Sequence, residues 1–221
     1  MSTIEKRGKQ LSKSSKIAGG IVVSALTVAA TMSLGVPQAM AAGAPAKAEN
    51  ATVATSKSIG SLGALTDLVI ERLRVSDDVA ASKFGTDSPI DDPAREQQVL
   101  DQVRTQATAL GLDPDAAAAF FRDQITASKV VQRGLFARWT AHPDEAPTTR
   151  PDLGQIRTRL DQLTTALLQE LKSTVDVRGE PVSCTIHLAL ATGSAVLLDK
   201  LDALHRQALH TAVHAVCISP W

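Results

Sequence analysis

The sequence predicts an all-α fold, a single-domain bundle of about six helices with a disulfide in its C-terminal part. Alanine and leucine are abundant whereas glycine accounts for only 13 of the 221 residues, a composition that favours helices. Apolar residues recur every three or four positions over long segments, and no alternation of period two lasts long enough to indicate a sheet. The length suits one or two domains and is sufficient to bury a core. Because no internal repeat divides the helical region, we expect one domain.

Residues 1–41 have the features of a secretory signal peptide. Five basic residues precede a segment without charge, 17–46, and the small-x-small motif at 39–41 is the pattern that signal peptidase reads. Residues 17–36 are about long enough to span a bilayer as an uncleaved anchor, but their glycine, serine and threonine content makes this segment weakly apolar. We therefore expect an exported protein, secreted or periplasmic, that is cleaved near Ala41.

Cleavage changes the charge balance of the protein. The whole chain carries 23 basic and 23 acidic residues, and removal of five basic and one acidic residue leaves 18 against 22, a net charge of about −4. A nucleic-acid partner is not expected, because the chain has no excess of basic residues to bind phosphates. It also has only 3% aromatic residues, and no tyrosine, on which bases could stack. No membrane association is expected after cleavage. Residues 42–60 read as a flexible leader, and residues 61–221 as the helical domain.

The first two helices are bounded by glycine and aspartate. From Ser61 the apolar residues recur at helical spacing, and Gly85 closes this first helix. Asp91 or Asp92 can cap a second helix, and Pro93 then lies in its first turn, where proline is favoured. Gly111 is expected to end this second helix.

A third and a fourth helix repeat these signals. Asp113, followed by proline, starts a helix that runs to about Trp139. Residues 142–151 contain three prolines and must form a loop. Asp152 then precedes an amphipathic pattern that fades near Val177.

The C-terminal part of the chain contains both cysteines. Residues 178–181 predict a turn, and residues 183–217 resume a helical pattern. Cys184 and Cys217 are the only possible pair in an exported chain, so a disulfide between them is the default. It would close 34 residues, which the chain-entropy model values at on the order of 4 kcal/mol. A redox-active pair is the alternative, although the CxxC spacing is missing.

Two cations lie on the apolar stripe of the first helix, where leucine would be expected. Arg72 and Lys83 are 11 residues apart, and 11 steps of 100° end within about 20° of three full turns, so both project from one face. A buried unpaired charge costs several kcal/mol, so each cation needs a partner or a ligand. Alternatively, the stripe drifts and both side chains extend to water.

Polar residues on the other helices can meet these two cations. They lie in the first turn of the second helix, on or beside the stripe of the third, and beside the stripe of the fourth: Asp92, Arg95, Glu96, Ser128, Gln132 and Arg157. Arginines favour planar, bidentate recognition of carboxylate or phosphate. We therefore expect a pocket for a small multiply anionic ligand. No histidine, cysteine or exposed serine forms a nucleophile-base pair there, so its chemistry would be electrostatic.

These residues, at these spacings, resemble the all-helical chorismate mutases, and specifically the exported subclass with a signal peptide and a C-terminal disulfide. The resemblance spans roughly residues 62–217. It implies conversion of chorismate to prephenate by an intramolecular Claisen rearrangement, with no cofactor, no metal and no covalent intermediate. The segments that carry it are Glu71-Arg72-Leu73, Lys83, Pro89 to Glu96, Asp123-Gln124-Ile125, Ser128-x-x-x-Gln132, Arg157 and the Cys184/Cys217 pair.

The resemblance implies a clamp for the two carboxylates of the substrate. Arg72, Arg95 and Arg157 look like the cations of this clamp, and Ser128 would assist at the ring carboxylate. Smaller members of the family take one arginine from a partner chain, whereas the longer exported members supply it internally, and Arg157 is our candidate for that arginine. Dimers are common in the family, so we expect a homodimer.

The resemblance also implies the residues that act at the reacting bond. Lys83 and Gln132 resemble the pair that donates hydrogen bonds to the ether oxygen, while Asp92 and Glu96 would meet the ring hydroxyl. Two alternatives remain: an isochorismate lyase on the same fold, and a non-catalytic exported helical binding protein. Glu96 and the exported architecture favour the mutase over the lyase. The full set of site cations weighs against loss of activity.

Three histidines fall in one late helical segment. His210 and His214 have the i,i+4 spacing of a metal-binding pair, but no acidic or cysteine ligand completes a recognisable motif. We expect these two residues and His205 to lie on a solvated helix face.

Overall fold

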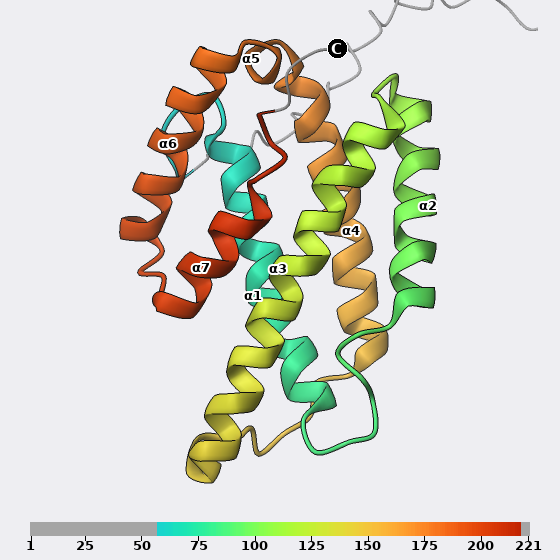
Figure 1. The fold of residues 1–221 in the computed structure, drawn as a ribbon, viewed down its shortest axis with the longest axis vertical. Coiled ribbons are helices and arrows are strands. Elements are labelled where there is room, and N and C mark those ends of the chain that lie inside the picture. Colours follow the sequence, from blue (N-terminus) through green and yellow to red (C-terminus); the bar gives the residue numbers. More distant parts are fainter. Residues whose placement is uncertain (1–56, 218–221) are drawn as a thin grey trace, which may run out of the picture. The chain divides into compact units, whose positions relative to one another are not determined.

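The computed structural model describes residues 57–217, and these form seven α-helices and one 3-10 turn without any strand (Figure 1). The all-α fold class is therefore confirmed. The predicted signal peptide and most of the leader lie outside the described residues. The elements are α1 (Gly63–Lys83), α2 (Pro93–Leu110), α3 (Pro114–Ala141), η1 (Pro143–Glu145), α4 (Leu153–Ser173), α5 (Val175–Gly179), α6 (Pro181–Leu198) and α7 (Ala203–Ala212).

Aspartate side chains start four of the helices. Asp92, Asp113, Asp152 and Asp202 each accept a hydrogen bond from the backbone N–H three residues further on, at 3.0, 2.6, 2.8 and 2.8 Å respectively. Such a cap satisfies a backbone donor that has no partner inside the helix and contributes about 1 kcal/mol. Between the two candidates, Asp92 is the residue that caps α2.

Helix α1 lies at the centre of the bundle. It packs against α3, α4, α6 and α7, and α2 covers the side formed by α3 and α4 (Figure 1). The core between α1 and α3 contains Leu65, Val69 and Leu73 together with Phe120 and Phe121, all at most 1% exposed. Burying side chains of this size stabilises a fold by about 1.5–3 kcal/mol each. This packing fixes the helices that carry the predicted site residues.

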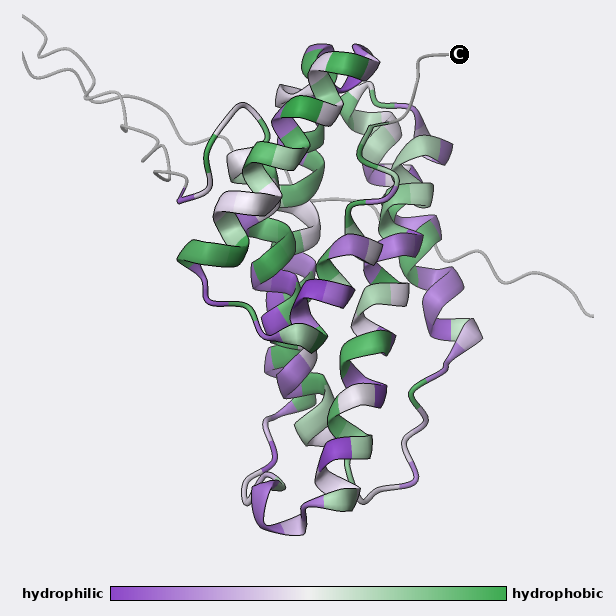
Figure 2. Ribbon diagram, turned by 60° about the vertical axis from the view of Figure 1, so that its left-hand side comes forward, coloured by the Kyte–Doolittle hydropathy of each residue, from purple (hydrophilic) through white to green (hydrophobic). Residues whose placement is uncertain are grey.

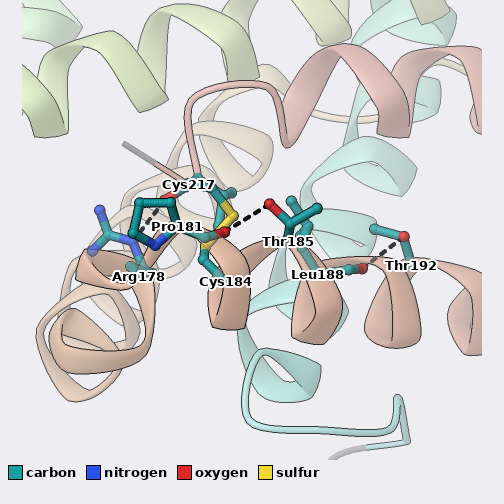
Figure 3. The surroundings of a disulfide bond; sticks show 8 residues. Arg178, Pro181, Cys184, Thr185, Leu188, Thr192 and Cys217 are labelled. Carbon is teal, nitrogen blue, oxygen red and sulfur yellow. Dashed lines mark hydrogen bonds between the residues drawn. A yellow bond between two sulfur atoms is a disulfide. The ribbon is translucent and has the colours of Figure 1, made fainter. Parts of the chain in front are cut away.

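The C-terminal segment is fastened to α6 and α5. The predicted disulfide between Cys184, in the first turn of α6, and Cys217 is present (Figure 3). Next to it, the Arg178 guanidinium donates to the carbonyl oxygen of Val216 at 3.1 Å and to that of Leu171 at 2.8 Å. The covalent bond and these hydrogen bonds hold the end of the chain against the helices that precede it.

The C-terminal helices differ from the sequence prediction in their boundaries. The region expected to form one helical segment, residues 183–217, is divided at 199–202, where Lys200 adopts a positive φ of 51° and Asp202 caps a new helix. The turn expected at 178–181 is shorter, because α5 continues through Gly179 and α6 already begins at Pro181. The pattern that fades near Val177 reflects the end of α4 at Ser173 and the short α5.

His205 is not on a solvated face, so that expectation is wrong for this residue, whereas His210 and His214 are exposed. Its Nδ1 lies 2.8 Å from Asp202 Oδ1, and its Nε2 lies 3.1 Å from Asp77 Oδ1 on α1. The hydrogen bond with Asp77 is the main cause that raises the pKa of His205 to about 9, against partial desolvation that lowers it. The imidazolium therefore ties α7 to α1 at neutral pH.

This tie predicts a loss of stability in alkaline solution. A group whose pKa is raised in the folded state stabilises the fold fully below its unfolded pKa, and this contribution disappears as the pH rises through the folded value of about 9. Because solvent screens a half-buried ion pair, we expect the free energy of unfolding to fall by about 1 kcal/mol between pH 6 and pH 9.5. Urea unfolding of residues 42–221 at the two pH values measures this change. The His205→Gln variant should lack it, and an equal loss in both proteins would contradict the assignment.

Candidate active site

A cavity of about 290 Å³ lies between α1, α2, α3, α4 and the segment that joins α1 to α2. Its volume is close to the lower end of the range for small-molecule sites. Its apolar lining includes Val79, Ile125, Ile156 and Leu160. The structure brings together, around this one cavity, all eight residues singled out from the sequence: Arg72, Lys83, Asp92, Arg95, Glu96, Ser128, Gln132 and Arg157.

Arg72 is the most deeply placed cation of the cavity. The residue is 8% exposed, its guanidinium lies 5.7 Å from the centre of the Phe121 ring, and one of its terminal nitrogens donates to the carbonyl oxygen of Leu160 at 3.4 Å. Its Nε is buried and has no partner within the described part of the chain. Burial lowers the pKa of Arg72 to about 10, and the carboxylate of Asp161 opposes this shift. Arg72 thus remains charged at neutral pH with unused donors.

Lys83 is the last residue of α1 and reaches the loop that follows. Its Nζ donates a hydrogen bond of 2.8 Å to the carbonyl oxygen of Pro89. Burial lowers the pKa of Lys83, and the negative charges of Asp92, Asp91 and Glu96 oppose this effect. An ammonium group has three donors, so further hydrogens remain for a ligand in the cavity.

Gln132 and Ser128 lie one turn apart on α3. The Gln132 amide nitrogen donates to Ser128 Oγ at 3.1 Å, and the Gln132 side chain is almost fully buried. Its amide oxygen has no partner among the residues described. Because an amide carries two N–H donors, one hydrogen can bind Ser128 while the other remains available to a ligand.

The start of α2 forms the acidic side of the cavity. The backbone N–H of Asp92 donates to Glu96 Oε1 at 3.3 Å, while Arg95 extends to Gln98 Oε1 at 2.9 Å on the exposed side of the helix. The carboxylate of Glu96 accepts hydrogen bonds of 2.9 Å from Lys129 at both oxygens. Arg95 and, from α4, Arg157 are exposed residues, so these two cations lie at the mouth of the cavity rather than in its depth.

Two charged residues that line the cavity, Lys129 and Asp161, were not predicted from the sequence. Lys129 binds Glu96 and lies 3.2 Å from Asp91, and its pKa is raised, chiefly by the hydrogen bond to Glu96. Asp161 lies one turn after Arg157 on α4 and is the carboxylate that acts on Arg72. Because Asp161 follows Arg157 by four residues, the sequence could have predicted that both lie on the same face of α4. The pairing of Lys129 with Glu96 depends on how α2 packs on α3, which no local pattern reports.

This arrangement suits a small ligand with two anionic groups. Five cations line a partly apolar space, with Arg72 deep in it and the other four nearer the opening or the loop, and the amide of Gln132 adds a further donor. No histidine or cysteine lies among the residues that line the cavity, and the described residues contain no group of three or more potential metal ligands. The side chains present can therefore act on a ligand by orientation and by charge.

Residues 63–133 match the family model described as chorismate mutase type II. This match spans α1, α2 and most of α3, and the matched segment contains seven of the eight predicted site residues. A protein from Mycolicibacterium smegmatis named secreted chorismate mutase is 37% identical over 164 residues, which is 74% of this chain and 90% of the relative. A protein of the same name from Mycobacterium tuberculosis is 35% identical over 156 residues, 71% of this chain and 78% of the relative.

Solved structures show the same arrangement of helices. The crystal structure of chorismate mutase from Burkholderia phymatum superposes with a TM-score of 0.68 at 36% identity, covering 72% of this chain and 97% of that one. The enzyme from Burkholderia thailandensis gives 0.67 at 38% identity, with coverage of 71% and 99%.

Proposed function

The chain belongs to the chorismate mutase type II family, and we propose that the cavity between α1, α2, α3 and α4 is where it binds chorismate and rearranges it to prephenate. As a chorismate mutase, the protein is an isomerase. The observation that carries the proposed site is the convergence of the four predicted cations, Lys83 among them, and the amide donor of Gln132 on one cavity. The names of its relatives support export of this chain, and we propose cleavage near Ala41.

The cations of the cavity account for substrate orientation. Arg72, in the depth of the cavity, retains donors that a carboxylate can fill, and Arg95 and Arg157 at the mouth can hold the second carboxylate. Ser128 adds a hydroxyl at the ring carboxylate. Holding both ends selects the compact conformer in which the two reacting carbons approach each other, and such orientation can lower a barrier substantially.

The donors of the cavity account for stabilisation of the transition state. As the C–O bond breaks and the new C–C bond forms within one molecule, negative charge grows on the ether oxygen. The half-buried Lys83 and the almost fully buried Gln132 are the donors proposed to face this oxygen, and burial strengthens the hydrogen bond of Gln132 because little water competes for it. Since the charge is larger in the transition state than in the substrate, these hydrogen bonds accelerate the reaction.

The acidic side of the cavity is proposed to position the ring hydroxyl of the substrate. Glu96 is held by Lys129 at 2.9 Å and by the backbone N–H of Asp92 at 3.3 Å, so its carboxylate has a defined position before a ligand arrives. The side chain of Asp92 caps α2 and lies beside it. A retained Glu96 weighs against the alternative of an isochorismate lyase.

A single assay distinguishes the candidate functions. Purified residues 42–221 are incubated with chorismate, the loss of its ultraviolet absorbance is followed, and the product is identified. We expect prephenate. Lyase products from isochorismate, with chorismate left unchanged, would establish the alternative enzyme, and a protein inert towards both compounds would establish a binding protein.

Replacing Lys83 by alanine should reduce kcat far more than it reduces stability. Loss of one oxyanion donor lowers kcat by about 10²- to 10³-fold, whereas removing a half-buried cation whose hydrogen bond goes to an exposed loop carbonyl costs the fold little. Lys172→Ala is the matched control, because Lys172 is also a lysine in the last turn of a helix but does not line the cavity. Steady-state kinetics and thermal unfolding are measured for both variants. An unfolded Lys83→Ala protein would show that Lys83 is structural.

Gln132 predicts a characteristic dependence of the rate on pH. An amide donates a hydrogen bond at any pH, so the kcat of the unaltered protein should hold from mildly acidic to neutral solution. In Gln132→Glu only the protonated carboxyl can donate, and kcat should fall steeply above about pH 5 to 6, the range of a modestly raised glutamate pKa. Profiles of kcat from pH 4.5 to 8 test this. A steep loss above pH 6 in the unaltered protein would contradict the role of Gln132.

A further inference from the structure

Lys129, on α3, lies between two carboxylates at the acidic side of the cavity. It follows Ser128, lines the same cavity, and only 19% of its side chain is exposed. Hydropathy does not distinguish it, because hydrophilic and hydrophobic residues alternate along most of the helices (Figure 2). Its partners distinguish it, since its ammonium group binds the carboxylate of Glu96 on α2 and that of Asp91 in the segment before α2.

The three hydrogens of this ammonium group are already used within the chain. Lys129 Nζ lies 2.9 Å from each carboxylate oxygen of Glu96 and 3.2 Å from Asp91 Oδ1. An ammonium group has three donors and no acceptor, so these three contacts occupy all of them. Arg72 and Lys83, by contrast, retain donors for a ligand. Lys129 therefore lines the cavity without being suited to bind a carboxylate of the substrate.

Glu96 has one acceptor position left for a ligand. Its Oε1 accepts from Lys129 and from the backbone N–H of Asp92 at 3.3 Å, whereas Oε2 accepts from Lys129 alone among the residues that the structure describes. A carboxylate offers about four lone-pair positions, two on each oxygen. The remaining position on Oε2 can accept one hydrogen, and one hydrogen is what a hydroxyl group donates.

A positively charged group bound at this position would lie close to Lys129. Because Nζ is 2.9 Å from Oε2, and a hydrogen bond to the same oxygen is about 2.7–3.2 Å long, the two charges could be at most about 6 Å apart. Asp92 lines the same side of the cavity, but its carboxylate caps α2 and the residue is exposed, so water screens its charge. The repulsion from Lys129 therefore remains.

We propose that Lys129 determines which ring substituent of the substrate the site accepts: a neutral hydroxyl group is bound, and a protonated amine at the same carbon is excluded. This inference rests on the proposed function, because it takes Glu96 as the partner of the ring hydroxyl. Lys129 does not touch the substrate in this arrangement. It is a positioning residue that fixes the carboxylate of Glu96 and places its own charge where a second cation would be repelled.

Two substrates measure this specificity. Purified residues 42–221 are incubated at about pH 6.5 with chorismate and, separately, with the analogue in which an amino group replaces the ring hydroxyl, since an amine is protonated at this pH. The ratio of the two kcat/KM values expresses the preference of the enzyme. With two partly screened charges about 6 Å apart, this ratio should favour chorismate by at least about tenfold.

Replacing the lysine should change this ratio. Lys129→Met keeps most of the side-chain volume but removes the charge, so it should lower the preference for chorismate by about tenfold. Lys129→Arg retains the charge and should preserve the preference. Arg133→Met is the matched control, because Arg133 also binds Asp91, at 2.7 Å, but its side chain is 55% exposed and does not line the cavity. This control should leave the ratio unchanged.

The ratio separates specificity from stability, since a damaged fold would slow both substrates alike. Equal efficiency with the two substrates in the unaltered chain, or an unchanged ratio in Lys129→Met, would overturn the role of Lys129 and leave the proposed function intact. The ratio of the unaltered chain tests the proposal even if Lys129→Met does not fold. A chain inert towards chorismate would overturn the proposed function and this inference with it.

Discussion

The burial of positive charge between packed helices is the constraint on which the rest of this structure depends. Arg72 is placed among Leu160, Phe121 and the core of α1, where its guanidinium is desolvated and incompletely hydrogen-bonded. Such a cation persists only if the helices around it are held firmly enough that it cannot turn out to water. Helix α1 packs against four neighbours, α3, α4, α6 and α7, and this packing keeps the charge in place.

The helices beyond the cavity contribute to it indirectly. α7 packs on α3 and α6 packs on α1, so the C-terminal part supports the two helices that carry Arg72, Lys83, Ser128 and Gln132. The disulfide and Arg178 in turn hold that C-terminal part together. None of these supporting helices lines the cavity. The cavity and the helices that support its walls therefore occupy separate parts of the described chain.

Local signals in the sequence were sufficient to predict most of the fold and eight of the charged or polar residues that line the cavity. Aspartate caps such as Asp113 and Asp152 mark helix starts, and a cation at a leucine position, as at Arg72, reports its own unusual environment. Features that depend on contacts between helices were not predictable in this way. Lys129 and His205 resemble ordinary surface residues until α2 and α1 supply Glu96 and Asp77. The break between α6 and α7 at Lys200 contains no glycine or proline from which it could have been predicted.

The unused donors of Arg72 have a consequence for the stability of the protein. An anion that completes the hydrogen bonds of Arg72 would bind the folded state and so stabilise it relative to the ligand-free protein. The free energy of unfolding therefore depends on the concentration of such anions in the medium. The covalent link between Cys184 and Cys217 acts independently of any ligand. The disulfide therefore stabilises the ligand-free protein, whose free energy of unfolding is lowered by the desolvated Arg72.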